Sequence, residues 1–243
     1  MNKKLIYSIV SLSILSSTLI ADEGVKQSIN LGFSNTSGNT DTLNFNGKYI
    51  MDAVTSGYAG NDLKIAFDTS AFLTENDDIK NNEEYTANLG LEQNIMNGWL
   101  GYTSMNWLKN KFRNFDAKAA FGAGVGKELL NDGKQSLKVK LGAAYNLENF
   151  ANGSDNTRFG TINEYLEYNN KLNKTSNLYL KAGVAERYND MNDYEAIGAI
   201  GVNFVVAENI SVTLEEEVSY DKAPSLCFDK TDTKTIVRVG YNF

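Results

Sequence analysis

The stretch that decides the fold is Val237-Arg238-Val239-Gly240-Tyr241-Asn242-Phe243. Its four apolar residues alternate with Arg238, Gly240 and Asn242, and successive side chains of a strand point to opposite faces. The pattern therefore predicts a strand with lipid on one face and a polar lumen on the other. An edge strand of a soluble sandwich would show the same alternation, so the rest of the chain has to separate the two folds.

The N-terminus predicts export. Lys3 and Lys4 precede an uncharged run over residues 5–20, and the small residue Ala21 follows. A positive start, an apolar middle and a small residue at the cut are typical of a secretory signal. We expect residues 1–21 to be a cleaved signal peptide and residues 22–243 to form one domain. No later apolar run approaches the length that a membrane-spanning helix needs.

Alternating segments recur along the whole mature chain. The clearest pair, 115–130 and 135–148, is joined by Asn131-Asp132-Gly133-Lys134, and Asp-Gly is a strong signal for a tight hairpin. The pattern predicts an all-β fold, a single antiparallel up-and-down transmembrane barrel of about 12 strands with both termini in the periplasm. The expected strands are 25–34, 41–53, 61–72, 84–95, 99–109, 115–130, 135–148, 159–171, 176–188, 194–206, 210–220 and 232–243.

The connections between these segments predict the location. Short ones at 96–98, 131–134, 172–175 and 207–209 alternate with longer polar ones at 73–83, 149–158, 189–193 and 221–231. Bacterial outer-membrane barrels have short periplasmic turns and longer outer loops. We therefore expect the cell outer membrane of a Gram-negative bacterium, with outer-membrane lipids and lipopolysaccharide as surroundings.

The composition argues against several kinds of chemistry. The sequence contains no His and a single Cys, Cys227, and its formal net charge is −7. Without His there is no Ser-His nucleophile pair and no His-ligated metal site, and the negative charge disfavours a nucleic-acid partner. We expect no enzyme, no cofactor and no metal site.

Charged residues on the inward face are the candidate functional residues. Both signs occur, so they either pair across the lumen and plug it or line a narrow polar channel. Lys118, Lys138 and Lys140 are expected to form one basic patch, with Glu128 beside Lys138. By alternation the lumen-facing candidates are Lys26, Lys48, Lys64, Asp68, Glu92, Asp116, Lys118, Glu128, Lys138, Lys140, Lys181, Glu195, Glu215, Glu217 and Arg238.

Three motifs carry a family resemblance. The segment Ser34–Thr42, the segment Asn110–Asp116 with the glycines that follow it, and the C-terminal Tyr-Asn-Phe resemble an uncharacterised family labelled salt-induced outer-membrane proteins. The resemblance implies an outer-membrane barrel without an established activity. It also implies that Val239, Tyr241 and Phe243 are the signal read by the barrel assembly machinery.

Two of these motifs make local predictions. Ser37, Gly38, Asn39, Thr40 and Asp41 are residues that favour a tight outer turn. A second group, at the rim of the barrel, is expected to form an ion-pair cluster: Lys111, Arg113 and Asp116.

The expected function is a narrow channel for small polar solutes. The alternative is a plugged structural or surface-binding barrel, whose loops 73–83 and 221–231 contact lipopolysaccharide or other cells. The sequence leaves the oligomeric state and any role of Cys227 open.

Overall fold

The computed structural model describes residues 25–37, 42–76, 79–224 and 229–243. Four predictions lie outside these ranges: the signal peptide, most of the Ser37–Asp41 turn, the tip of the 73–83 connection and the position of Cys227.

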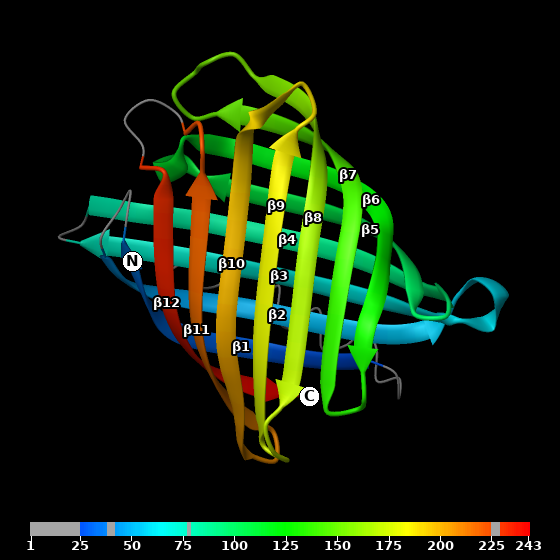
Figure 1. The fold of residues 1–243 in the computed structure, drawn as a ribbon. Helices are drawn as coiled ribbons and strands as arrows, with labels where there is room; N and C mark the ends of the chain where they lie inside the picture. Colours follow the sequence, from blue (N-terminus) through cyan, green and yellow to red (C-terminus); the bar gives the residue numbers. More distant parts are fainter. Residues whose placement is uncertain (1–24, 38–41, 77–78, 225–228) are drawn as a thin grey trace.

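The described chain forms one closed antiparallel barrel, in which each strand pairs with its neighbours in sequence and β1 pairs with β12 (Figure 1). The prediction of a 12-stranded up-and-down barrel is confirmed, and the predicted strand ends are correct to within a few residues. The strands are β1 Val25–Ser37, β2 Thr42–Ser56, β3 Asp62–Asn76, β4 Ile79–Met96, β5 Trp99–Asn110, β6 Phe115–Asn131, β7 Gln135–Phe150, β8 Thr157–Lys171, β9 Ser176–Arg187, β10 Asp190–Ala207, β11 Ile210–Asp221 and β12 Thr231–Asn242.

Period-two alternation divides each strand between two environments. On β7, Leu141 and Tyr145 are exposed on the outside, whereas Asn146 and Glu148 are buried inside. The outer wall is predominantly apolar and most polar groups are turned inward, which is the arrangement a bilayer favours because lipid cannot satisfy polar groups. The chain is an outer-membrane barrel.

The ends of the barrel differ from each other. The chain termini lie at the end with the tight turns, where Gly98 and Gly133 adopt positive φ of 75° and 82°. The helices among the described residues are two single 3₁₀ turns, η1 Tyr58–Gly60 and η2 Lys111–Arg113, and neither is long enough to cross a membrane.

At the outer end, two of the predicted long loops are mostly strand. β3 continues to Asn76 and β4 begins at Ile79, while β9 and β10 leave only residues 188 and 189 between them. At this end the paired strands continue past the apolar part of the outer wall, because backbone pairing extends into segments whose side chains are polar. The outer loops therefore exceed the periplasmic turns in length by less than the sequence predicted. The longer outer connections are residues 151–156 and 222–230.

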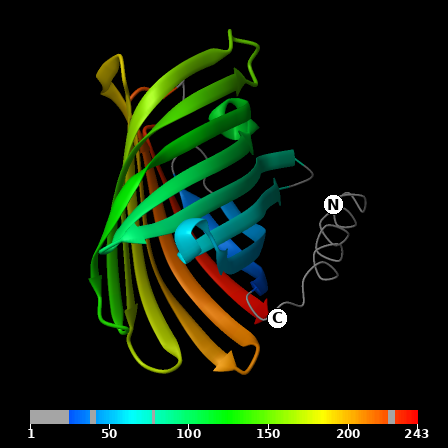
Figure 2. The ribbon, with the colours of Figure 1, turned by 90° about the vertical axis from the view of Figure 1, so that its right-hand side faces the viewer.

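The seam between β1 and β12 closes the barrel, whose strands run at a steep tilt so that the two walls cross (Figures 1 and 2). Gly32 meets this seam so closely that a Cβ there would lie 1.9 Å from the Val237 carbonyl oxygen. A residue without a side chain is required at this position for the two strands to stay in register.

Candidate functional site in the lumen

The barrel encloses a central cavity of about 520 Å³. Its lining combines apolar side chains with charged ones, and the ionic charges balance: six cationic residues accompany six carboxylates. The cations are Lys48, Arg113, Lys118, Lys181, Lys234 and Arg238, and the carboxylates are Asp68, Glu84, Glu167, Glu195, Glu215 and Glu217.

A first ion-pair cluster, the periplasmic cluster, lies in the half of the lumen near the chain termini. Its centre is Glu92 on β4, which pairs with Lys138 of β7 and whose Oε2 lies 3.0 Å from Lys140 Nζ. Lys140 also reaches Glu167 at 2.9 Å, and Lys64 lies 3.9 Å from Glu92. Because β4 and β7 are not neighbours in the wall, this cluster bridges the lumen.

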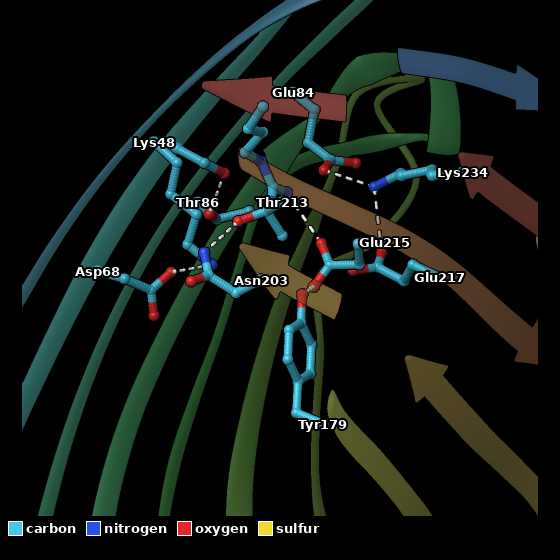
Figure 3. Close-up of polar contacts among 12 residues, drawn as sticks. Lys48, Asp68, Glu84, Thr86, Tyr179, Asn203, Thr213, Glu215, Glu217 and Lys234 are labelled. Atoms are coloured by element: carbon cyan, nitrogen blue, oxygen red, sulfur yellow. Dashed lines mark hydrogen bonds and ion pairs between the residues drawn. The ribbon is translucent and has the colours of Figure 1, made fainter. Parts of the chain in front are cut away.

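The middle of the cavity holds pairs between adjacent strands. Arg238 donates to Glu215 at 3.0 Å, and the Tyr179 hydroxyl donates to the same carboxylate at 2.5 Å. Lys48 of β2 lies 3.3 Å from Asp68 of the neighbouring strand β3. Figure 3 shows Lys48, Asp68, Tyr179 and Glu215 projecting into the lumen from different strands.

A second cluster, the outer cluster, bridges the lumen nearer the outer mouth. Lys234 of β12 lies 2.8 Å from Glu84 of β4 and 3.5 Å from Glu217 of β11 (Figure 3). Lys118 of β6 pairs with Glu195 of β10 and lies 3.0 Å from Glu148. Ion pairs that join strands from different parts of the wall therefore lie both in the periplasmic half of the lumen and along the outer part of the central cavity.

The outer mouth contains a smaller pocket of about 100 Å³ beside the stacked rings of Phe115 and Phe150. Arg113 lies 3.6 Å from Asp232, and Arg187 lies 2.8 Å from Asp193. Two arginines are outnumbered by six carboxylates, so this mouth is acidic although the central cavity is balanced. The carboxylates are Glu148, Asp193, Glu195, Asp221, Asp229 and Asp232.

Most of the sequence-predicted lumen residues contribute to this interior. Eight line the central cavity: Lys48, Asp68, Lys118, Lys181, Glu195, Glu215, Glu217 and Arg238. Lys64, Glu92, Lys138 and Lys140 form the periplasmic cluster. Lys26 stands opposite Asp52 in the pairing of β1 with β2.

The structure places Asp116 differently from the prediction. The pairing of β6 with β7 shifts between Phe115 and Ala117, and this irregularity turns Asp116 to the outside, where it lies 3.5 Å from Lys109 and 3.9 Å from Lys111. Asp116 is therefore not a lumen residue. The rim cluster is also divided, because Arg113 points inward to Asp232.

The expected basic patch is not present as predicted. Lys138 and Lys140 share Glu92, whereas Lys118 belongs to the outer cluster with Glu148 and Glu195. Glu128 stands opposite Lys138 in the sheet, but its carboxylate accepts a hydrogen bond from Asn131. Each of the three lysines is thus neutralised by carboxylates from other strands.

Several site residues were missing from the sequence prediction. Glu84 and Lys234 share the inward parity of Glu92 and Arg238, so alternation was a sufficient signal for both. Glu148, Glu167 and Arg187 follow the same rule on their own strands. Among the described residues, no three His, Cys, Asp or Glu side chains are grouped so that they could hold a metal ion.

Comparison with known proteins agrees with this architecture. Residues 29–243 match the family described as a protein of unknown function, DUF481. No curated protein matches the sequence significantly.

Solved structures with a similar fold are outer-membrane barrels. The NanC porin has a TM-score of 0.56 at 8% identity, with 88% of this chain and 98% of that chain covered. An outer-membrane channel from Pseudomonas putida F1 has a TM-score of 0.56 at 9% identity, with 92% and 97% covered. Outer membrane phospholipase A from Escherichia coli has a TM-score of 0.53 at 12% identity, with 88% and 92% covered. At these identities the likeness shows a shared fold.

Proposed function

The chain belongs to the DUF481 family of proteins of unknown function, and from this premise we propose that it is a narrow, gated channel for small polar solutes. The observation that supports the proposal most is the central cavity, whose lining carries balanced charges of both signs. A cavity of this kind holds water and small polar molecules, and its lining offers hydrogen bonds and charges of both signs.

The periplasmic cluster is the proposed gate. Glu92 holds Lys138 and Lys140 across the lumen, and the side chains of all three are mostly shielded from water. Ion pairs can break and re-form without unfolding the strands that carry them. This distinguishes them from a plug of packed apolar side chains, whose removal would require rearrangement of the wall.

The test is single-channel conductance in planar bilayers, comparing the parent with Glu92→Gln. Loss of the carboxylate leaves Lys138 and Lys140 without their shared counter-charge, and their repulsion should widen the lumen. We expect a higher conductance or a higher open probability. Glu208→Gln is the matched control, because Glu208 is an exposed residue of the β10–β11 turn and its loss should leave conductance unchanged.

A plugged structural barrel is the second candidate, and the outer cluster favours it. Two of its ion pairs, Lys234 with Glu84 and Lys118 with Glu195, link strands that are not paired in the sheet. Such contacts across the lumen would hold the wall of the barrel in place. In that case correctly folded parent and Glu92→Gln would both be silent. The outer loops, including residues 222–230, would then be the parts that contact lipopolysaccharide or other cells.

The remaining proposals concern partners and chemistry. The C-terminal residues Val239, Tyr241 and Phe243, which are exposed on the outer wall, fit recognition by the barrel assembly machinery.

The absence of His from the sequence supports the proposal that the chain is not an enzyme. Induction by salt stays a prediction of the family resemblance, and transcript levels at raised salt would test it.

A further inference from the structure

A carboxylate lies in the middle of the lipid-facing wall. Glu164 is the central residue of β8, the strand between β7 and β9 (Figure 1). Its neighbours Asn163 and Tyr165 face the lumen: Asn163 is buried, and the Tyr165 ring packs edge-on against Tyr102. Alternation therefore turns Glu164 outward, and its side chain is exposed.

The nearest outward-facing neighbours of Glu164 are apolar, and the outward-facing Glu186 of β9, which stands opposite Ile162, lies one diagonal step away. Ile162 and Leu166 flank it along β8, Leu141 stands opposite it on β7, and Val184 stands opposite it on β9. Among the described residues, no hydrogen bond or ion pair reaches its carboxylate.

Glu216 is an outward-facing carboxylate that has a hydrogen-bond partner within the chain. It stands opposite Ile200, and it accepts a hydrogen bond of 2.6 Å from the Thr235 hydroxyl. Glu164 has no such neighbour. A charged or unpaired polar group within the bilayer is unfavourable, so a partner from outside the chain would stabilise Glu164.

We infer that the β7–β9 wall is an interface with a second copy of this chain, centred on Glu164. Lipid headgroups lie at the membrane surfaces and cannot supply a polar group at the depth of a mid-strand residue. A two-fold axis along the membrane normal brings the same patch of both copies together. It places the two Glu164 side chains at equal depth, where two adjacent carboxyl groups can share one proton.

The shape of the wall is compatible with close approach. Ala143 on β7 and Ala182 on β9 lie diagonally beside Glu164, and small side chains allow two barrel walls to come near each other. The hydrogen-bonded carboxyl pair would then be covered by Leu141, Leu166 and Val184 of both copies. This interface is independent of whether the lumen conducts.

Cysteine cross-linking in native outer membranes tests the inference. In a Cys227→Ser background, Leu166→Cys places a thiol two residues from Glu164, and Leu89→Cys places one on β4 in a different part of the wall. With a short bismaleimide, we expect cross-linked dimers from Leu166→Cys at several times the yield from Leu89→Cys. Equal yields from the two positions would overturn the inference.

Variants of Glu164 in the Leu166→Cys chain make the test specific. Glu164→Gln keeps a group that can pair with its copy and should retain the dimer, whereas Glu164→Leu should reduce the cross-linked yield several-fold. Glu216→Leu, which removes the carboxylate already bound by Thr235, should leave the yield unchanged. Folding of each variant is checked by heat-modifiable migration on gels, and a folded Glu164→Leu protein that cross-links as well as the parent would refute the role of Glu164.

Discussion

Lys118 of β6 and Glu195 of β10 form an ion pair although β7, β8 and β9 separate their strands in the wall. The contact therefore crosses the lumen and ties together two parts of the sheet that no backbone hydrogen bond joins directly. A double-mutant cycle with Lys118→Met and Glu195→Gln should give a coupling energy of about 1–3 kcal/mol. Urea unfolding in lipid vesicles measures it, and additive effects of the two changes would show that the pair does not brace the barrel.

The pair between Glu84 and Lys234 should be the costliest to break. The two side chains are only 8% and 15% exposed, and Asn110 also donates to Glu84 at 2.8 Å. Glu84→Gln leaves a shielded lysine without its nearest counter-charge, which costs roughly 3–5 kcal/mol. Reversible unfolding in the same vesicles checks this, with the exposed Glu208→Gln as control; equal stabilities of the two variants would contradict it.

Ion selectivity should follow the acidic outer mouth. Lys118, Lys138 and Lys140 are neutralised and do not form the basic patch that alternation predicted, whereas carboxylates outnumber arginines at the outer mouth. Any conducting form should therefore prefer cations. Reversal potentials in a salt gradient test this, and Asp221→Asn with Asp229→Asn should move them toward zero. An anion preference in the parent would contradict the prediction.

Asp132 makes a pH-dependent contribution to the turn between β6 and β7, outside the membrane. Its carboxylate accepts hydrogen bonds from the backbone N–H groups of Gln135 and Lys134, which lower its pKa below the ordinary value. A lowered folded-state pKa means that the contribution is present above the unfolded pKa, about 3.9, and is lost as pH falls through the folded value.

A carboxyl titration of Asp132 by NMR in detergent micelles would measure this shift. In Asp132→Asn the local acid sensitivity of the turn should disappear. A titration midpoint at or above the ordinary value in the parent would show that these hydrogen bonds do not favour the ionised form.

Phe243 should be required for efficient assembly. It is exposed on the outer wall next to Tyr241, with ring centroids 5.1 Å apart, so a charged residue there disturbs both the apolar belt and the terminal signal. Phe243→Asp should lower the amount of heat-modifiable protein in the outer-membrane fraction. Asn242→Asp, one residue away in sequence, is the control; equal assembly of the two variants would count against a recognition role.

Alternation was enough to predict the strands, because lipid and lumen impose opposite polarity on neighbouring residues. It failed at Asp116, where one irregular pairing reverses the face of a single residue. It also failed for the grouping of Lys118, Lys138 and Lys140, because their partners lie on strands distant in sequence. Which inward residues meet across the lumen depends on strand tilt and barrel closure, and neither has a local sequence signal.

The seam between β1 and β12 has a consequence for folding. Ile29 pairs with Tyr241, so the contact that closes the barrel joins the two extremes of the domain, while every other strand pair is a hairpin of sequence neighbours. Contacts between distant parts of a chain form slowly because the entropy of a very large loop has to be lost first. Until they form, the edges of β1 and β12 offer unpaired backbone groups to any other strand. Closure of this seam should therefore be the last and slowest step in folding, and the step at which misassembly between chains competes.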